Sequence, residues 1–185
     1  MFNLPELLNK LVDLVQGVWE TLFGCSLPHP REAMNWKAVS IDTVIGAWLD
    51  DWEVPLKFRH FWHAVNFELS SARPEPANSF EIYNWETGKF ESAKHIIVRP
   101  EWASPGVIAH ESAHVAYSLF LNQNQKTNFT VVIELVSQKN KLVRRIIKET
   151  NWGNVWQERH AEIYRFLGQQ MPKELKKYYP KLLEE

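Results

Sequence analysis

The chain has 185 residues, of which 45% are hydrophobic, and a formal net charge of −1 at pH 7. This length fits one compact domain, and the near-neutral charge gives no overall electrostatic case for a nucleic-acid partner. The one cysteine, Cys25, excludes an internal disulfide framework and a cysteine-based zinc finger, and it fits a reducing compartment.

The first predicted helix spans residues 4–22, where an apolar residue recurs every three or four positions. This segment carries Glu6, Asp13 and Glu20, lacks a basic leader region and has no unbroken apolar core. It therefore indicates an amphipathic helix and neither a signal peptide nor a membrane span. We expect a cytoplasmic protein that is a monomer.

Further helices are predicted over residues 40–52 and 56–67, so that residues 1–71 form a helical N-terminal region. A loop with two prolines follows over residues 72–79 and is the clearest boundary in the chain. The second part, residues 79–185, is expected to pack against this region in one compact unit.

The periodicity changes after the boundary. Alternating residues predict strands over 80–83 and 93–98, with a turn at 87–88 between them. The remaining elements are helices, predicted over residues 107–120, 130–149, 155–171 and 172–183. The sequence thus predicts an α+β protein with a small β-sheet.

The helix predicted over 107–120 carries an HExxH motif formed by His110, Glu111 and His114. Residues four apart lie within about 40° of each other around a helix, so the two imidazoles can bind one zinc ion. Glu111, about 100° away, can reach a water molecule that the metal activates. The alternative is a helix with coincidental histidines, but packing gives no reason to place these three side chains on one edge.

A catalytic zinc usually takes three protein ligands. A metzincin would need histidine at position 120, where the chain has Phe120, and every aspartate precedes the motif. Downstream of the motif, the remaining candidates for the third ligand are one histidine, His160, and several glutamates. Glu158 and Glu162 stand out because glutamates four apart on a helix repel each other unless a cation lies between them. The alternative is a solvated acidic face neutralised by Arg165.

These pieces resemble the gluzincin zinc peptidases, most closely the minimal soluble gluzincins and the ImmA/IrrE-type intracellular proteases. The similarity covers about residues 80–171 and consists of the strand 93–98, the HExxH helix and the downstream segment 158–162. It implies a zincin-like fold in which residues 79–185 are the catalytic domain and the N-terminal helical region is an addition.

The resemblance implies a zinc-dependent metalloendopeptidase that hydrolyses a peptide or protein substrate. His110, His114 and Glu158 would bind Zn²⁺, Glu111 would act as the general base, and Glu162 would accept a hydrogen bond from a ligand histidine. It also implies that an extended substrate adds to a free edge of the strand 93–98.

Four side chains are candidates to stabilise the oxyanion: Tyr117, His160, Tyr164 and Arg165. Of these, we expect Tyr117 to act in catalysis because it follows the ligand face of the HExxH helix. A different function is an inactive zincin-fold zinc-binding protein that serves as a protein-interaction module. The basic stretch 139–148 is interpreted as a solvated face, so no nucleic-acid partner is expected.

Overall fold

The computed structural model describes residues 40–71, 77–84 and 89–184. Contacts divide the chain into two compact units, Met1–Asn35 and Trp36–Glu185, and every element described below belongs to the second. The helix predicted over 4–22 and the turn predicted at 87–88 lie outside the described residues.

Two short helices begin the described chain, α2 (Ile41–Asp51) and α3 (Leu56–His63). The side chain of Ser40 accepts a hydrogen bond from the backbone N–H of Thr43 and so caps α2. The apolar face of α2, including Trp48, is buried, and the helix predicted over 40–52 is confirmed.

The helix predicted over 56–67 is only half right. α3 ends at His63, and strand β1 (Asn66–Leu69) follows at once. Residues 66–69 pair with residues 95–98 of a strand much later in the chain. Those inter-strand hydrogen bonds compete with helix extension, and no local pattern reveals so distant a partner.

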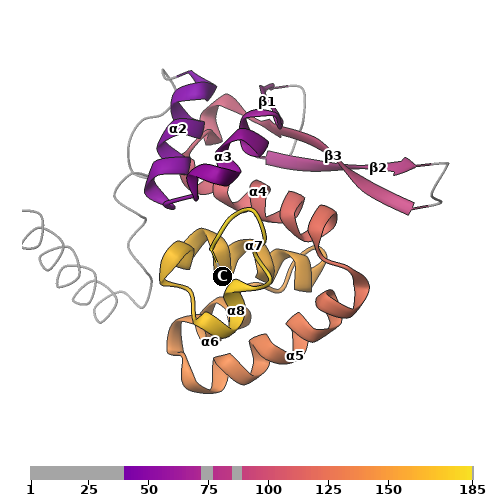
Figure 1. The fold of residues 1–185 in the computed structure, drawn as a ribbon, viewed down its shortest axis with the longest axis vertical. Helices are drawn as coiled ribbons and strands as arrows, with labels where there is room; N and C mark the ends of the chain where they lie inside the picture. The colour runs from indigo at the N-terminus through magenta and orange to yellow at the C-terminus, as the bar shows by residue number, and fades with distance from the viewer. Residues whose placement is uncertain (1–39, 72–76, 85–88, 185) are drawn as a thin grey trace, which may run out of the picture. The chain divides into compact units, whose positions relative to one another are not determined.

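The sheet contains β1, β2 (Ala77–Asn84) and β3 (Lys89–Val98) in the order β1-β3-β2 (Figure 1). β1 runs parallel to β3, whereas β2 is antiparallel to it. Both predicted strands exist and are longer than expected. β3 is the central strand of this sheet, and its residues 96–98 pair with a strand on each side.

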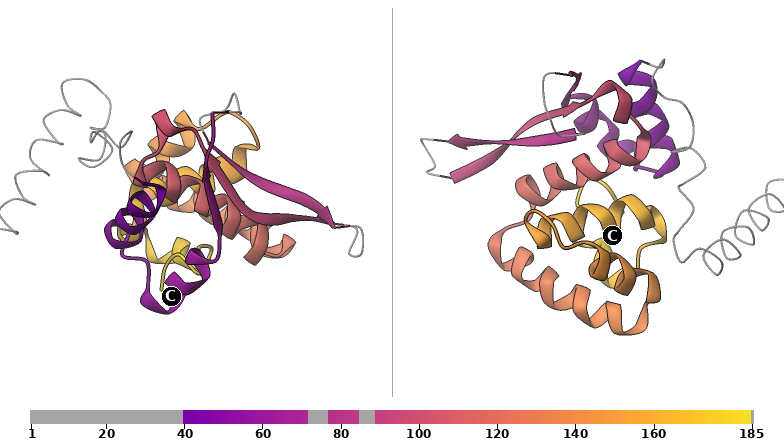
Figure 2. Two further views of the ribbon diagram at one scale, coloured as in Figure 1. Left: turned by 90° about the horizontal axis from the view of Figure 1, so that it is seen from above. Right: turned by 180° about the vertical axis from the view of Figure 1, so that it is seen from behind.

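Helix α4 (Pro105–Phe120) carries the HExxH motif and lies between the sheet and the C-terminal helices (Figures 1 and 2). The hydroxyl of Ser104 accepts a hydrogen bond from the backbone N–H of Val107, and Pro105 occupies the first turn, where proline is well tolerated. α4 packs on β2 and β3 on one side and on helix α7 (Val155–Leu167) on the other.

The helix predicted over 130–149 is two helices, α5 (Gln123–Lys139) and α6 (Lys141–Glu149). Asn140 separates them because its side chain accepts hydrogen bonds from the backbone N–H groups of Leu142 and Val143, which starts a new helix. The prediction of one continuous helix over 130–149 therefore overlooked Asn140, which is the N-cap residue of a second helix.

The last two predicted helices are shorter than expected. α7 ends at Leu167 because Gly168 takes a φ of 46°, a conformation suited to glycine at a helix end, and a 3₁₀ turn covers Gly168–Gln170. α8 (Lys173–Lys176) is one turn long. The chain after it bends through turns that bury Tyr179 and Leu182.

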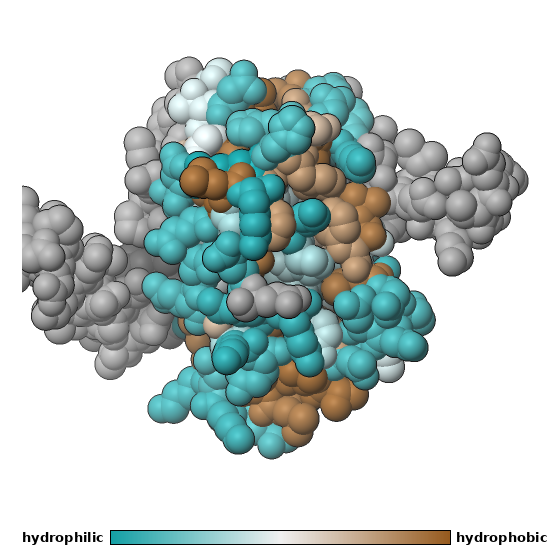
Figure 3. Space-filling model, viewed as in Figure 1, coloured by the Kyte–Doolittle hydropathy of each residue, from teal (hydrophilic) through white to brown (hydrophobic). Residues whose placement is uncertain are grey.

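The structure is thus a mixed α+β fold, mostly helical, with a three-stranded sheet. The face drawn in Figure 3 is largely hydrophilic, with hydrophobic side chains gathered at its lower end, where α5 and α6 lie in Figure 1. Within the described ranges, every helix is too short or too polar to cross a lipid bilayer.

Candidate metal centre

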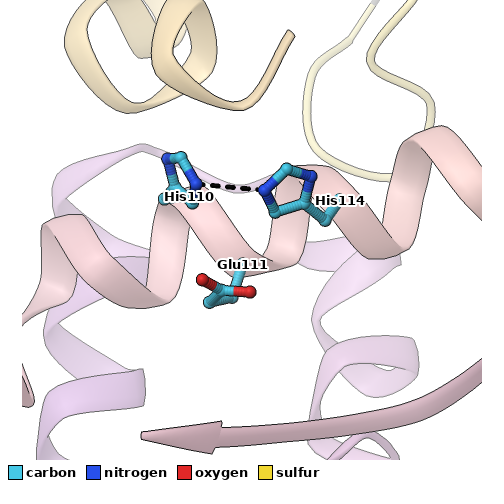
Figure 4. A group of neighbouring side chains, drawn as sticks. All are labelled: His110, Glu111 and His114. Carbon is cyan, nitrogen blue, oxygen red and sulfur yellow. Dashed lines mark hydrogen bonds between the residues drawn. The ribbon is translucent and has the colours of Figure 1, made fainter. Parts of the chain in front are cut away.

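His110 and His114 project from one side of α4, one turn apart. Their Nε2 atoms are 3.0 Å apart, and Figure 4 shows the two rings pointing toward each other. Glu111 leaves the helix on another side, yet the candidate ligand atoms of all three residues lie within 4.8 Å of one another. The predicted motif therefore forms a group positioned to hold a metal ion.

Glu158 reaches this group from α7. Its Oε2 atom is 3.3 Å from Nε2 of His110 and 3.5 Å from Nε2 of His114. With the His110–His114 distance of 3.0 Å, the three atoms form a nearly equilateral triangle. Because α7 packs directly on α4, two helices far apart in sequence together build this donor set.

The dimensions of the triangle are compatible with a tetrahedral zinc ion. Ligand bonds of about 2.0–2.2 Å at tetrahedral angles place neighbouring donor atoms about 3.4 Å apart. The observed separations of 3.0, 3.3 and 3.5 Å lie close to that value. Two imidazoles and one carboxylate are also donors that suit zinc. The residues therefore fit the metal that the sequence predicts.

Glu162, one turn after Glu158 on α7, approaches the other side of the His110 ring. Its Oε1 atom lies 2.8 Å from Nδ1 of His110 and 3.5 Å from a guanidinium nitrogen of Arg165. The side chain of Glu162 is only 8% exposed. The two glutamates thus contact different nitrogens of one imidazole, and Glu162 is closest to the nitrogen that faces away from the triangle.

Protonation of the cluster follows from these contacts. Burial acts to lower the pKa of His110, but the hydrogen bonds to Glu158 and Glu162 outweigh it and raise this pKa from 6.5 to about 9. For Glu158, burial acts to raise the pKa, and the hydrogen bonds from His110 and His114 bring it down from 4.5 to about 2. The pKa of Glu162 is lowered too, against the effect of its burial, mainly by His110. Without a metal, these carboxylates hold a proton on His110.

A cavity of about 730 Å³ opens over the cluster. His110, Glu111, His114, Glu158 and Glu162 all line it. Glu111 is otherwise buried, at 6% exposure, so the cavity is its route to a bound molecule. The site is therefore accessible to a ligand larger than water.

Tyr117 is not among the residues that line the cavity. Its ring packs edge-on against Phe129 and His160 and lies beneath the ammonium group of Lys126. Position 117 shares the histidine face of α4, but α5 and α7 cover it there. The geometry gives no support to the predicted catalytic role of Tyr117.

His160 lies in the core, away from the ligand triangle. It is fully buried, stacks on Tyr179 and donates from Nε2 to the carbonyl oxygen of Tyr178 at 2.7 Å. Burial lowers its pKa to about 3, so the ring is neutral. Tyr164 is also fully buried. Of the four oxyanion candidates, Arg165 is the one that lines the cavity.

The sequence did not point to several other residues of the cavity wall. Trp102 lines it from the 3₁₀ turn just before α4, Trp152 from the loop just before α7, and residues 77–79 from β2. A local pattern cannot assign them, because each reaches the cavity only through the packing of α4 and α7. The one available signal is the position of each tryptophan just before a helix that carries metal-ligand candidates.

Comparison with models of known protein families, with curated proteins and with solved structures gives no match to this chain. What the structure establishes is the mixed α+β fold and a His-Glu-His group that can hold a metal ion.

Proposed function

We propose that the chain is a zinc-dependent metallopeptidase of gluzincin-like design, with His110, His114 and Glu158 as the metal ligands. One observation carries the proposal: three donor atoms stand 3.0–3.5 Å apart at a cavity that Glu111 also lines. Zinc held there would supply a Lewis acid that polarises a peptide carbonyl and lowers the pKa of water towards neutrality.

Glu111 acts as the general base in this proposal. Its carboxylate takes a proton from the water that attacks the carbonyl carbon, and it passes that proton to the amine as the C–N bond breaks. Glu111, which lines the cavity beside both histidines, is not a metal ligand in this proposal, because Glu158 takes the third position. It can therefore carry a proton without giving up a bond to the metal.

Arg165 stabilises the oxyanion. The carbonyl oxygen gains negative charge as water attacks, and a fixed cation that faces it lowers the barrier. Arg165 lines the cavity and lies beside Glu162, 3.5 Å from its carboxylate. This assignment replaces the earlier expectation for Tyr117, whose ring is covered by neighbouring side chains.

The substrate in this proposal is an extended peptide segment. The sequence suggested that it would add to a free edge of residues 93–98, but that strand is central and already paired along residues 95–98. β2 is one of the two edge strands of the described sheet, and its residues 77–79 line the cavity. An added strand would therefore pair with β2 and pass over the metal cluster.

The test is the Glu111→Gln variant, compared with the unmodified chain on an unstructured protein substrate. Glu111→Gln should keep its zinc, because Glu111 is not a ligand, and should lose hydrolysis by several orders of magnitude. Glu149→Gln is a matched control that should leave the rate unchanged, since Glu149 is an exposed residue of α6 that pairs with Arg145.

Hydrolysis that persists undiminished in Glu111→Gln would refute the mechanism. If the unmodified chain binds zinc and cleaves nothing, the alternative gains support: a zincin-fold zinc-binding protein that acts as an interaction module.

A further inference from the structure

Two tryptophans of the described chain depart from the packing of the others. Trp48, Trp52 and Trp62 are buried in the core, whereas Trp102 and Trp152 are 52% and 50% exposed. A large apolar side chain left in water usually marks a binding surface when it does not stand alone. Both exposed tryptophans line the cavity that contains the metal cluster.

The two indoles come from different parts of the chain. Trp102 ends the 3₁₀ turn Pro100–Trp102 just before α4, and Trp152 lies in the loop just before α7. Val107 of α4 also lines the cavity. The charged cluster of His110 and the glutamates therefore shares its cavity with three apolar side chains. A ligand that contacts the apolar side chains and the charged cluster at once would carry a large apolar side chain and a polar backbone.

Trp152 is tied to the metal cluster through its neighbour. Gly153 has a φ of 58°, and a Cβ atom there would lie 3.1 Å from Oε1 of Glu158. The loop backbone thus packs against the carboxylate of a ligand candidate, with Trp152 one residue away. A side chain held by Trp152 would belong to a residue at, or next to, the bond presented to the metal.

We propose that Trp102 and Trp152 form a binding site for an aromatic side chain of the peptide substrate, next to the bond that is cleaved. This site rests on the proposed peptidase function, and it would give the enzyme a preference for an aromatic residue beside the cleaved bond. Aromatic rings bind each other in offset or edge-on geometry beyond the effect of area alone. Tryptophan is also rigid and amphipathic, which makes it a frequent anchor of recognition sites.

The experiment measures binding separately from cleavage. The full chain with Glu111→Gln is loaded with zinc and titrated in a calorimeter with short blocked peptides that differ only in one central residue, phenylalanine or alanine. We expect the phenylalanine peptide to bind about 10-fold more tightly or better. Trp102→Ala and Trp152→Ala should each reduce this preference by roughly 2- to 10-fold and barely change the affinity for the alanine peptide.

Three further variants control for misfolding and non-specific effects. Trp102→Phe and Trp152→Phe should restore part of the preference, which a merely damaged fold would not do. Leu56→Ala, at a residue that is 81% exposed and does not line the cavity, should keep the preference in full.

Equal binding of the two peptides, or a preference that survives loss of both tryptophans, would overturn the proposal. Cleavage assays on the chain with Glu111 intact then distinguish failure of the aromatic site from failure of the peptidase function. Aromatic preference in binding with no cleavage of any peptide would refute the peptidase and leave this site standing. Cleavage that ignores the central residue would refute the site and leave the peptidase.

Discussion

Nδ1 of His110 lies 2.8 Å from Oε1 of Glu162, while Nε2 of the same ring lies 3.0 Å from Nε2 of His114. An ionised carboxylate can only accept a hydrogen bond, so in the neutral imidazole the proton belongs on Nδ1. The lone pair on Nε2 is then directed into the triangle. In the proposed metal site, Glu162 would therefore favour the tautomer of His110 that can bind the ion.

The first prediction concerns metal content. Purified protein should contain about one zinc per chain, and His110→Ala or His114→Ala should abolish it, because two remaining donors hold zinc poorly. Elemental analysis before and after a chelator gives the measurement. His63→Ala, an exposed histidine on α3, should keep the full content. Full zinc in both HExxH variants would disprove this metal site.

The second prediction separates Glu158 from Glu162. Glu158→Ala removes a donor atom and should weaken zinc far more than Glu162→Ala, which should cost about 10- to 100-fold in affinity or activity. His160→Ala should keep the metal, since His160 points to the carbonyl of Tyr178. Zinc titration against a competing chelator compares the three. If Glu162→Ala proves the more damaging glutamate change, the two roles must be exchanged.

Much of the candidate site could be predicted because it depends on helix geometry. The HExxH spacing places two imidazoles on one face wherever the helix lies, and the i,i+4 pair Glu158 and Glu162 obeys the same rule. Elimination of other residue types then pointed to α7. The structure adds the packing of α7 on α4, which brings Oε2 of Glu158 within 3.3–3.5 Å of both histidines.

The features that could not be predicted depend on contacts between distant segments. β1 forms because residues 66–69 find a partner at residues 95–98, and this pairing also removes the free edge expected on β3. Tyr117 shares the helical face of the histidines but is covered by Phe129 and His160. A wheel projection gives the direction of a side chain and not what lies opposite to it.

The third prediction is a pH dependence of zinc affinity. Zinc must displace the proton of His110, whose pKa is raised from 6.5 to about 9. The apparent affinity should therefore rise by about 10-fold per pH unit from 6.5 to about 9 and then level off. The stability of the metal-free fold changes with pH in the opposite direction. The stabilisation from charged His110 is complete below pH 6.5 and is lost as the pH rises through its pKa of about 9.

Chelator-buffered titrations at several pH values test this dependence. Glu162→Gln removes one carboxylate that holds the proton on His110, so its affinity should level off at a lower pH. An affinity that does not change between pH 6.5 and 9 in the unmodified chain would contradict the prediction.

The fourth prediction concerns Arg165. Arg165→Ala should lower kcat by about 10²- to 10³-fold, as loss of an oxyanion donor does, while the zinc content stays at one per chain. Arg165→Lys should recover part of the loss because it restores the charge without the planar donors. Arg159, on the same helix, packs over Trp156 and pairs with Glu134, so Arg159→Lys is the control and should remain active. A selective rise in KM with kcat unchanged would instead assign Arg165 to substrate binding.

The last prediction tests whether the loop before α7 fixes the metal ligand. A methyl group at position 153 would lie 3.1 Å from Oε1 and 3.3 Å from Cγ of Glu158, and the φ of 58° disfavours any side chain. Gly153→Ala should therefore shift the carboxylate and weaken zinc by about 10-fold or more. Gly46→Ala, in α2, would meet nothing within 4 Å and should leave zinc unchanged while it stabilises the fold by up to about 1 kcal/mol. Equal zinc affinity in the two variants would mean that Glu158 is positioned by α7 alone, because the added methyl group would then have displaced nothing that binds the metal.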